Sequence, residues 1–179
     1  NDIAILELTN DVPEELATPI PVLPPWLAIT REKIKQDLKI IFAGYGYDQN
    51  GYKGYRDWTY LKFTSYCDNP ANNHYCTYDN VLHIKGCPPA QKNCNSASEL
   101  NYEEKRLAFP KASFFYLQKN SGPCNGDSGG PALRAYGKRL YVAGITSYGD
   151  KLCKGYGVST AVQDYYDWII NIAPEVKQY

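Results

Sequence analysis

The chain has 179 residues and balanced charge, with 19 Lys+Arg against 19 Asp+Glu. This length suits one domain with a hydrophobic core, or two small barrels that share an interface. Because the charges balance, the chain has no overall positive potential that would attract nucleic acid or an anionic membrane. No stretch reaches the roughly 18 apolar residues of a membrane span. We therefore expect neither a nucleic-acid partner nor a membrane-spanning segment.

The six cysteines are an even number, and none of them stands in a C-x-x-C pair. The two histidines are poorly spaced to complete a zinc site, so disulfides are favoured over metal binding, and we expect no metal. Disulfides indicate an oxidising compartment, which predicts a secreted, extracellular or periplasmic protein. The cysteines are Cys67, Cys76, Cys87, Cys94, Cys124 and Cys153.

The first third of the chain predicts short elements. Residues 3–8 are mostly apolar and predict a short strand or a buried turn. Residues 11–30 carry five prolines and predict an extended connector, since proline interrupts helices and central strands. Composition allows a helical turn at 31–39, and strands are predicted at 40–47 and 55–63.

The rest of the chain predicts loops, then strands, then one helix. The polar segment 65–111 holds four cysteines and predicts disulfide-pinned loops, with room for one strand around 80–86. Strands are predicted at 113–117, 139–149 and 156–162, and a helix at 162–173 that Pro174 ends. Many short strands and one terminal helix predict an all-β antiparallel barrel.

The stretch "CNGDSGGP", residues 124–131, surrounds one serine with glycines. Gly126, Gly129 and Gly130 permit tight, positive-φ turns that expose Ser128. Such a turn aims the amides of Gly126 and Ser128 into one concavity, where they stabilise a developing oxyanion by about 3–4 kcal/mol for each donor. Taken alone, the stretch also fits a glycine-rich hairpin with an incidental Asp-Ser pair.

"GDSGGP" resembles the nucleophile signature of the chymotrypsin-like serine proteases. Four further segments resemble that family in the same chain order: "NDIAILEL" at the start, "AGYGY" at 43–47, "ITSYG" at 145–149 and "GYGVSTAV" at 155–162. "YYDWI" resembles its closing helix. The resemblance implies a chymotrypsin-like antiparallel double β-barrel. Residues 1–30 would form the end of the first barrel and the connector, residues 31–161 the second barrel, and residues 162–173 the C-terminal helix.

Carried over position by position, the resemblance assigns roles near Ser128. Ser128 becomes the nucleophile, and Asp2 becomes the carboxylate that orients a histidine. Gly126 and Ser128 supply the oxyanion-hole amides. Asp127 becomes the acid that pairs with a freshly cleaved amino terminus, and Cys124 pairs with Cys153. The implied mechanism is acyl transfer through a covalent intermediate, with no cofactor.

The same resemblance places a substrate pocket. Its floor is at Gly122, beside Pro123, and its walls include Ser147, Tyr148, Gly149 and Gly157. No acid stands at the floor, and the two wall glycines leave the slot open, so we expect cleavage after large apolar or aromatic residues. Asp150 would lie near the pocket mouth.

The family's chain order is histidine, aspartate, serine, and Asp2 already stands at the beginning of this sequence. His74 and His83 come after Asp2, and neither stands in the Ala-Ala-His-Cys sequence that surrounds the family's catalytic histidine. We therefore expect the catalytic histidine on an N-terminal chain of the same precursor. The expected protein is a two-chain serine endopeptidase that arises from a zymogen and acts on proteins or peptides. A non-catalytic binding or regulatory module is the alternative, whereas metal-dependent hydrolysis has no motif behind it.

Segment 65–111 departs from the family pattern. A cysteine usual shortly before the nucleophile loop is missing, so four cysteines allow three connectivities, of which we expect Cys67–Cys76 and Cys87–Cys94. The tyrosines of this segment are compatible with a substrate-binding exosite or with a surface loop pinned by disulfides.

Overall fold

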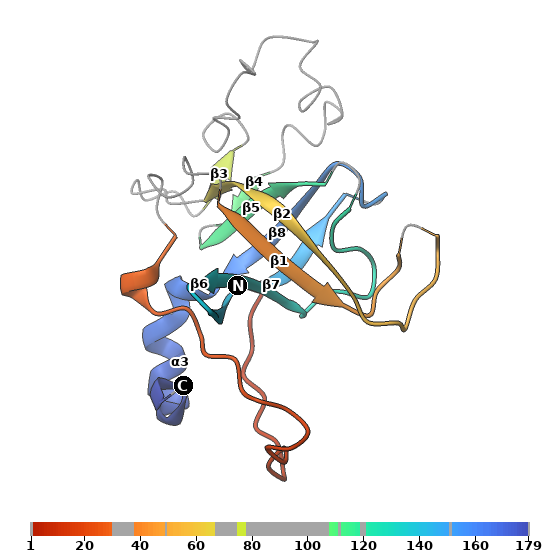
Figure 1. Cartoon of the computed structure of the whole chain (residues 1–179). Coiled ribbons are helices and arrows are strands. Elements are labelled where there is room, and N and C mark those ends of the chain that lie inside the picture. The colour runs from red at the N-terminus through yellow and green to blue at the C-terminus, as the bar shows by residue number, and fades with distance from the viewer. Residues whose placement is uncertain are drawn as a thin grey trace.

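The barrel predicted from the strand pattern is present. The computed structural model describes residues 2–29, 38–48, 50–66, 75–77, 108–110, 112–118, 121–150 and 152–178. Six antiparallel strands close a barrel in the order β1-β2-β5-β8-β7-β6 (Figure 1). They are β1 (Lys39–Gly44), β2 (Asp57–Tyr66), β5 (Ser113–Leu117), β6 (Pro131–Tyr136), β7 (Arg139–Gly149) and β8 (Tyr156–Ala161). A separate two-stranded sheet pairs β3 (Tyr75–Thr77) with β4 (Ala108–Pro110).

The predicted strand bounds match the structure closely at 113–117 and 139–149. Strand β6 was not predicted, because its sequence, PALRAY, directly follows the glycine-rich turn and opens with a proline. Pro131 is the first residue of β6, a position where proline is tolerated in a sheet. The fold is therefore an all-β barrel of the chymotrypsin-like kind.

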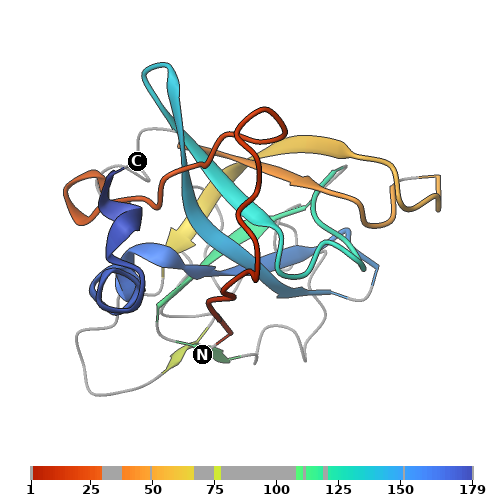
Figure 2. The same cartoon turned by 90° about the horizontal axis from the view of Figure 1, so that it is seen from below.

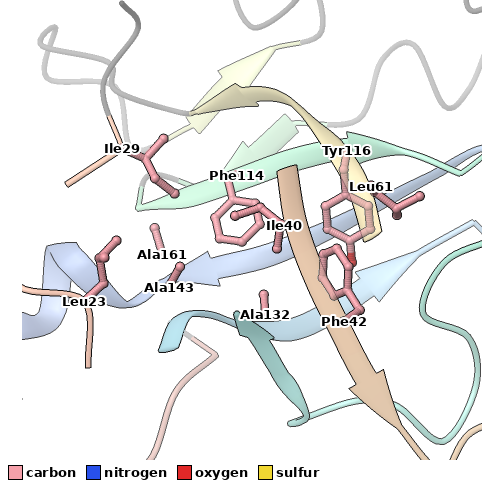
Figure 3. Close-up of a cluster of buried hydrophobic side chains, with 10 residues drawn as sticks. All are labelled: Leu23, Ile29, Ile40, Phe42, Leu61, Phe114, Tyr116, Ala132, Ala143 and Ala161. Carbon is pink, nitrogen blue, oxygen red and sulfur yellow. The ribbon is translucent and has the colours of Figure 1, made fainter. Parts of the chain in front are cut away.

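The barrel core consists of aromatic and aliphatic side chains from facing strands and from the connector (Figure 3). Phe114 and Tyr116 lie two residues apart on β5 and therefore point to the same side, into the barrel. The ring of Tyr116 lies 4.5 Å from that of Phe42 on β1, centroid to centroid. The core residues are Leu23, Ile29, Ile40, Phe42, Leu61, Phe114, Tyr116, Ala132, Ala143 and Ala161.

The proline-rich connector is extended, as predicted, and is anchored to the barrel (Figure 2). The Leu23 amide donates to the carbonyl of Val142 on β7 at 2.9 Å, and Leu23 is fully buried. Near its end, the Ile29 amide donates to Oε1 of Gln163 at 2.7 Å. A short 3-10 turn, η1 (Pro25–Leu27), lies between these two anchors.

The C-terminal helix is shorter than predicted. Residues 162–165 form the 3-10 turn η3 (Val162–Tyr165), and α3 (Tyr166–Ile172) follows it. Ile169 and Ile170 are its buried residues. A further 3-10 turn, η4 (Pro174–Gln178), begins at the proline. No helix in the described residues is long and apolar enough to cross a membrane.

The prediction for residues 3–8 was wrong. The segment forms no strand, and Leu6 and Leu8 are 84% and 63% exposed. An apolar run becomes a strand only where a neighbouring strand accepts its backbone hydrogen bonds, and the described chain offers none here.

Some predictions lie outside the described residues. These are the helical turn at 31–39 except its last two positions, the strand around 80–86, both histidines and the pairings of the first four cysteines.

Candidate active site

The loop before β6 presents Ser128 to solvent. Two backbone hydrogen bonds fold it: the Asp127 amide donates to Cys124 O at 3.0 Å, and the Gly130 amide donates to Asp127 O at 2.9 Å. Gly126 has φ +102° and Gly129 has φ +80°, so both occupy backbone regions that side chains disfavour. Ser128 is exposed, and its hydroxyl has no hydrogen-bond partner among the described residues.

The amides of Gly126 and Ser128 have no acceptor within the described part of the chain. Backbone N–H groups normally find a partner, and unpaired donors at an exposed turn are available to a ligand. Gly126 also needs to be glycine for close packing, since a Cβ there would lie 3.0 Å from the Cα of Gly46. This geometry suits binding of an oxyanion beside Ser128.

The Asp127 carboxylate ties this loop to the turn that follows β1. Its Oδ1 accepts a hydrogen bond from the Gly46 amide at 2.8 Å, and its Oδ2 accepts one from the Cys124 amide at 2.9 Å. A side chain at Gly44 or Gly46 would overlap this carboxylate, which explains the two glycines of "AGYG". A cavity of about 640 Å³ opens beside Asp127. Its lining comes from the β1–β2 hairpin and from residues 121–124 and 152–154.

Asp2 is held against β7 and β8. Ser147 Oγ donates a hydrogen bond to Asp2 Oδ2 at 2.5 Å, and Thr160 Oγ1 donates to the Asp2 carbonyl at 2.9 Å. The neighbouring Thr146 exchanges backbone hydrogen bonds with the nucleophile loop: the Gly129 amide donates to Thr146 O at 2.8 Å. The structure therefore brings Asp2 and Ser128 to the same end of β7. Ser147 was predicted only as a pocket wall, and its contact with Asp2 spans 145 residues, so no local signal revealed it.

Of the predicted pocket residues, Gly122 and Pro123 line the cavity beside Asp127, whereas Ser147, Tyr148, Gly149 and Gly157 are not part of its lining. Cys124 and Cys153 form a disulfide with their Cα atoms 5.3 Å apart, which confirms the expected pairing. Gly149 on β7 pairs with Gly157 on β8. Tyr148 is 38% exposed, and its partial burial raises its pKa to about 12, so its hydroxyl remains a neutral donor and acceptor.

Sequence reasoning missed the structural role of Asp150. Its Oδ1 accepts hydrogen bonds from the amides of Gly155 at 2.8 Å and Tyr156 at 3.0 Å. Its Oδ2 accepts from the amides of Leu152 at 3.1 Å and Lys154 at 3.3 Å. One carboxylate therefore organises the loop that carries Cys153. An acid followed by a five-residue turn that contains two lysines and a glycine before a strand was the available signal, but it is weak.

Replacing Asp150 with alanine should destabilise the protein measurably. The substitution leaves loop amides without an acceptor, and we expect the free energy of unfolding to fall by about 1–3 kcal/mol. For a chain of this size that corresponds to about 2–4 °C in Tm for each kcal/mol. Thermal unfolding measures the change, with Asp11→Ala, an exposed connector acid, as the control. Equal Tm values for the two variants would contradict the role given to Asp150.

Comparison with known proteins agrees with this geometry. The family described as Trypsin matches residues 89–169, a span that includes Ser128 and Ser147. Melanization protease 1 of Drosophila melanogaster is 30% identical over 178 residues, which cover 96% of this chain and 38% of that protein. Complement C1s subcomponent of Rattus norvegicus is 40% identical over 62 residues, which are 32% of this chain and 9% of that protein.

The CLIP domain-containing serine protease B4 of Anopheles gambiae is 43% identical over 49 residues, or 26% of this chain and 14% of that protein. The chain thus spans only a small part of the complement relatives and about two fifths of the melanization protease. The closed six-stranded barrel, the loop around Ser128 and these similarities agree with one another. Together, these similarities support a chymotrypsin-like serine protease.

Proposed function

We propose that this chain carries the serine and the aspartate of a serine endopeptidase that works through an acyl-enzyme. One observation carries the proposal. An exposed Ser128 hydroxyl lies in a turn with two amides that have no acceptor in the described chain, while Asp2 is bound at Ser147 on the adjoining end of β7.

In the proposed mechanism, a histidine takes the proton of Ser128 as its Oγ attacks the peptide carbonyl. The amides of Gly126 and Ser128 stabilise the oxyanion of the tetrahedral intermediate. Its collapse expels the amine, which receives the proton from the histidine. Water then attacks the ester while the histidine takes its proton. Collapse of this second intermediate releases the carboxylic acid, and the histidine returns the proton to Ser128 Oγ. Asp2 keeps the imidazole in the productive tautomer throughout.

We place the histidine on an N-terminal chain of the same precursor. The exposed apolar side chains of Leu6 and Leu8 support this placement, because a packed neighbouring segment would remove them from water. The cavity beside Asp127 supports a zymogen-type activation in which a new amino terminus enters and its ammonium group pairs with that carboxylate. The Asp127 carboxylate already accepts two backbone hydrogen bonds, and the ammonium group would add a stronger, charge-assisted one.

We further propose that the enzyme is secreted and acts on protein or peptide substrates. The disulfide Cys124–Cys153 supports an oxidising location. The absence of an acid at Gly122 and Gly157 supports cleavage after a large apolar or aromatic residue, because an uncharged pocket gives no partner for a cationic side chain.

Labelling with diisopropyl fluorophosphate tests the proposed function. We expect the reagent to modify the peptide that contains Ser128 in the processed full-length protein, and native mass spectrometry to show a second polypeptide bound to this chain. The Ser128→Ala variant serves as the control and should remain unlabelled. A folded, processed protein that takes up no label at Ser128 would overturn the protease proposal and leave the non-catalytic binding module.

A further inference from the structure

The expected pocket floor, Gly122, and one of the two wall glycines, Gly157, are backed by large polar side chains. A Cβ built on Gly122 would overlap the carboxamide of Gln118, and one built on Gly157 would overlap the ring of Tyr116. Tyr116 lies on β5 and Gln118 directly follows that strand, two residues further on. The Gln118 amide continues the strand pairing by donating to Gly155 O at 3.0 Å. Side chains two residues apart along such a ladder point to the same side.

Gln118 is only 1% exposed, which is unusual for a glutamine. Its Nε2 donates to the carbonyl of Pro123 at 2.7 Å, and this is its one side-chain hydrogen bond with the described residues. A carboxamide offers two donors and an acceptor with two lone pairs. Within the described part of the chain, Gln118 therefore has one further donor and one acceptor unused directly behind Gly122.

Tyr116 closes the space beside Gly157. Its side chain is 2% exposed and packs on Phe42, as Figure 3 shows. Burial raises the pKa of its phenol far above the usual value, and the nearby Asp127 adds to the rise, so the hydroxyl stays neutral. The groups behind the two glycines are thus large, uncharged and polar at their ends.

We propose that Gln118, with Tyr116 beside it, forms the floor of the primary substrate pocket and selects tyrosine over phenylalanine before the scissile bond. This inference rests on the proposed function and refines its substrate class. A phenol hydroxyl donates and accepts one hydrogen bond each, which matches the reserve of the carboxamide. Phenylalanine leaves that buried amide unpaired, and pockets that hydrogen-bond a substrate hydroxyl discriminate strongly against analogues without it.

Peptide substrates that differ only in this residue test the proposal in the full-length, processed protein. We expect kcat/KM for tyrosine to exceed that for phenylalanine at least about tenfold. Gln118→Leu should bring the two values within about twofold. Gln118→Glu, a nearly isosteric change, should raise kcat/KM for lysine relative to tyrosine about tenfold or more, because a buried carboxylate favours a cation. The matched control is Gln163→Leu, which removes the hydrogen bonds of a half-buried glutamine to Ile29 far from Gly122.

The control should leave the tyrosine-to-phenylalanine ratio unchanged. Labelling of Ser128 by diisopropyl fluorophosphate reports separately whether each variant folds and reacts. A labelled wild-type enzyme that cleaves after tyrosine and phenylalanine equally well overturns the role of Gln118 and leaves the protease function intact. A ratio that survives in labelled Gln118→Leu and Gln118→Glu also overturns it. A wild-type protein that is never labelled overturns the function itself.

Discussion

Replacing Asp2 with asparagine should lower kcat by about 10⁴-fold while the protein still folds. The amide of an asparagine presents an N–H where the carboxylate presented an acceptor, so the partner imidazole is held in the tautomer that cannot take the proton of Ser128. The hydrogen bond from Ser147 Oγ fixes the position of this side chain, which makes the effect specific to Asp2. Steady-state kinetics on the processed full-length protein measures it.

Two further variants make the Asp2 result interpretable. Asp11→Asn makes the same chemical change at an exposed position of the connector and should leave kcat unchanged. Ser147→Ala keeps the charge of Asp2 but removes its donor, and we expect a much smaller loss than from Asp2→Asn. An Asp2→Asn enzyme that keeps more than a tenth of the wild-type kcat would mean that another carboxylate supports the histidine.

Replacing Asp127 with alanine should lower kcat by about 10²–10³-fold, the usual result of losing one oxyanion-hole donor. The carboxylate binds the amides of Gly46 and Cys124 and so holds the nucleophile loop against the turn after β1. Without it, two half-buried amides lose their acceptor at about 1–3 kcal/mol each. The loop then relaxes, and the amide of Gly126 moves away from the position proposed for oxyanion binding.

Asp127→Asn separates the two properties of this side chain. The asparagine retains one acceptor oxygen but carries no charge to pair with an ammonium group. If Asp127→Asn is as inactive as Asp127→Ala, the ion pair with the new amino terminus is the dominant contribution. If it is nearly as active as the wild type, the backbone hydrogen bonds dominate. Wild-type kcat in Asp127→Ala, with circular dichroism showing an unchanged fold, would exclude both roles.

These effects depend on contacts between the loop around Ser128 and segments that are distant in the sequence. Gly46 and Gly126 lie 80 residues apart in sequence, yet a Cβ on one would approach the Cα of the other at 3.0 Å. The site therefore responds to changes in the β1–β2 hairpin as well as to changes beside Ser128. The disulfide between Cys124 and Cys153 adds a third tether, from the loop that Asp150 organises.

The sequence by itself determined the local features. Composition rich in aromatic and β-branched residues predicted strands β5 and β7 at their observed bounds, because such residues favour a pleated surface. Glycines around Ser128 predicted the positive-φ turns found at Gly126 and Gly129, since few other residues adopt them. The motifs in chain order also led to the pairing of Cys124 with Cys153.

Only the tertiary structure decided which groups meet. Strand-like composition at 3–8 produced no strand, because pairing needs a neighbour that local sequence does not specify. The wall glycine Gly157 suggested open space, but the ring of Tyr116 lies beside it, since barrel closure places β5 next to β8. Gln118, just after β5, likewise lies behind the expected floor at Gly122. The bond between Asp2 and Ser147 likewise joins residues 145 positions apart. Local patterns follow from the backbone's own geometry, whereas contacts at such separations exist only after the barrel has closed.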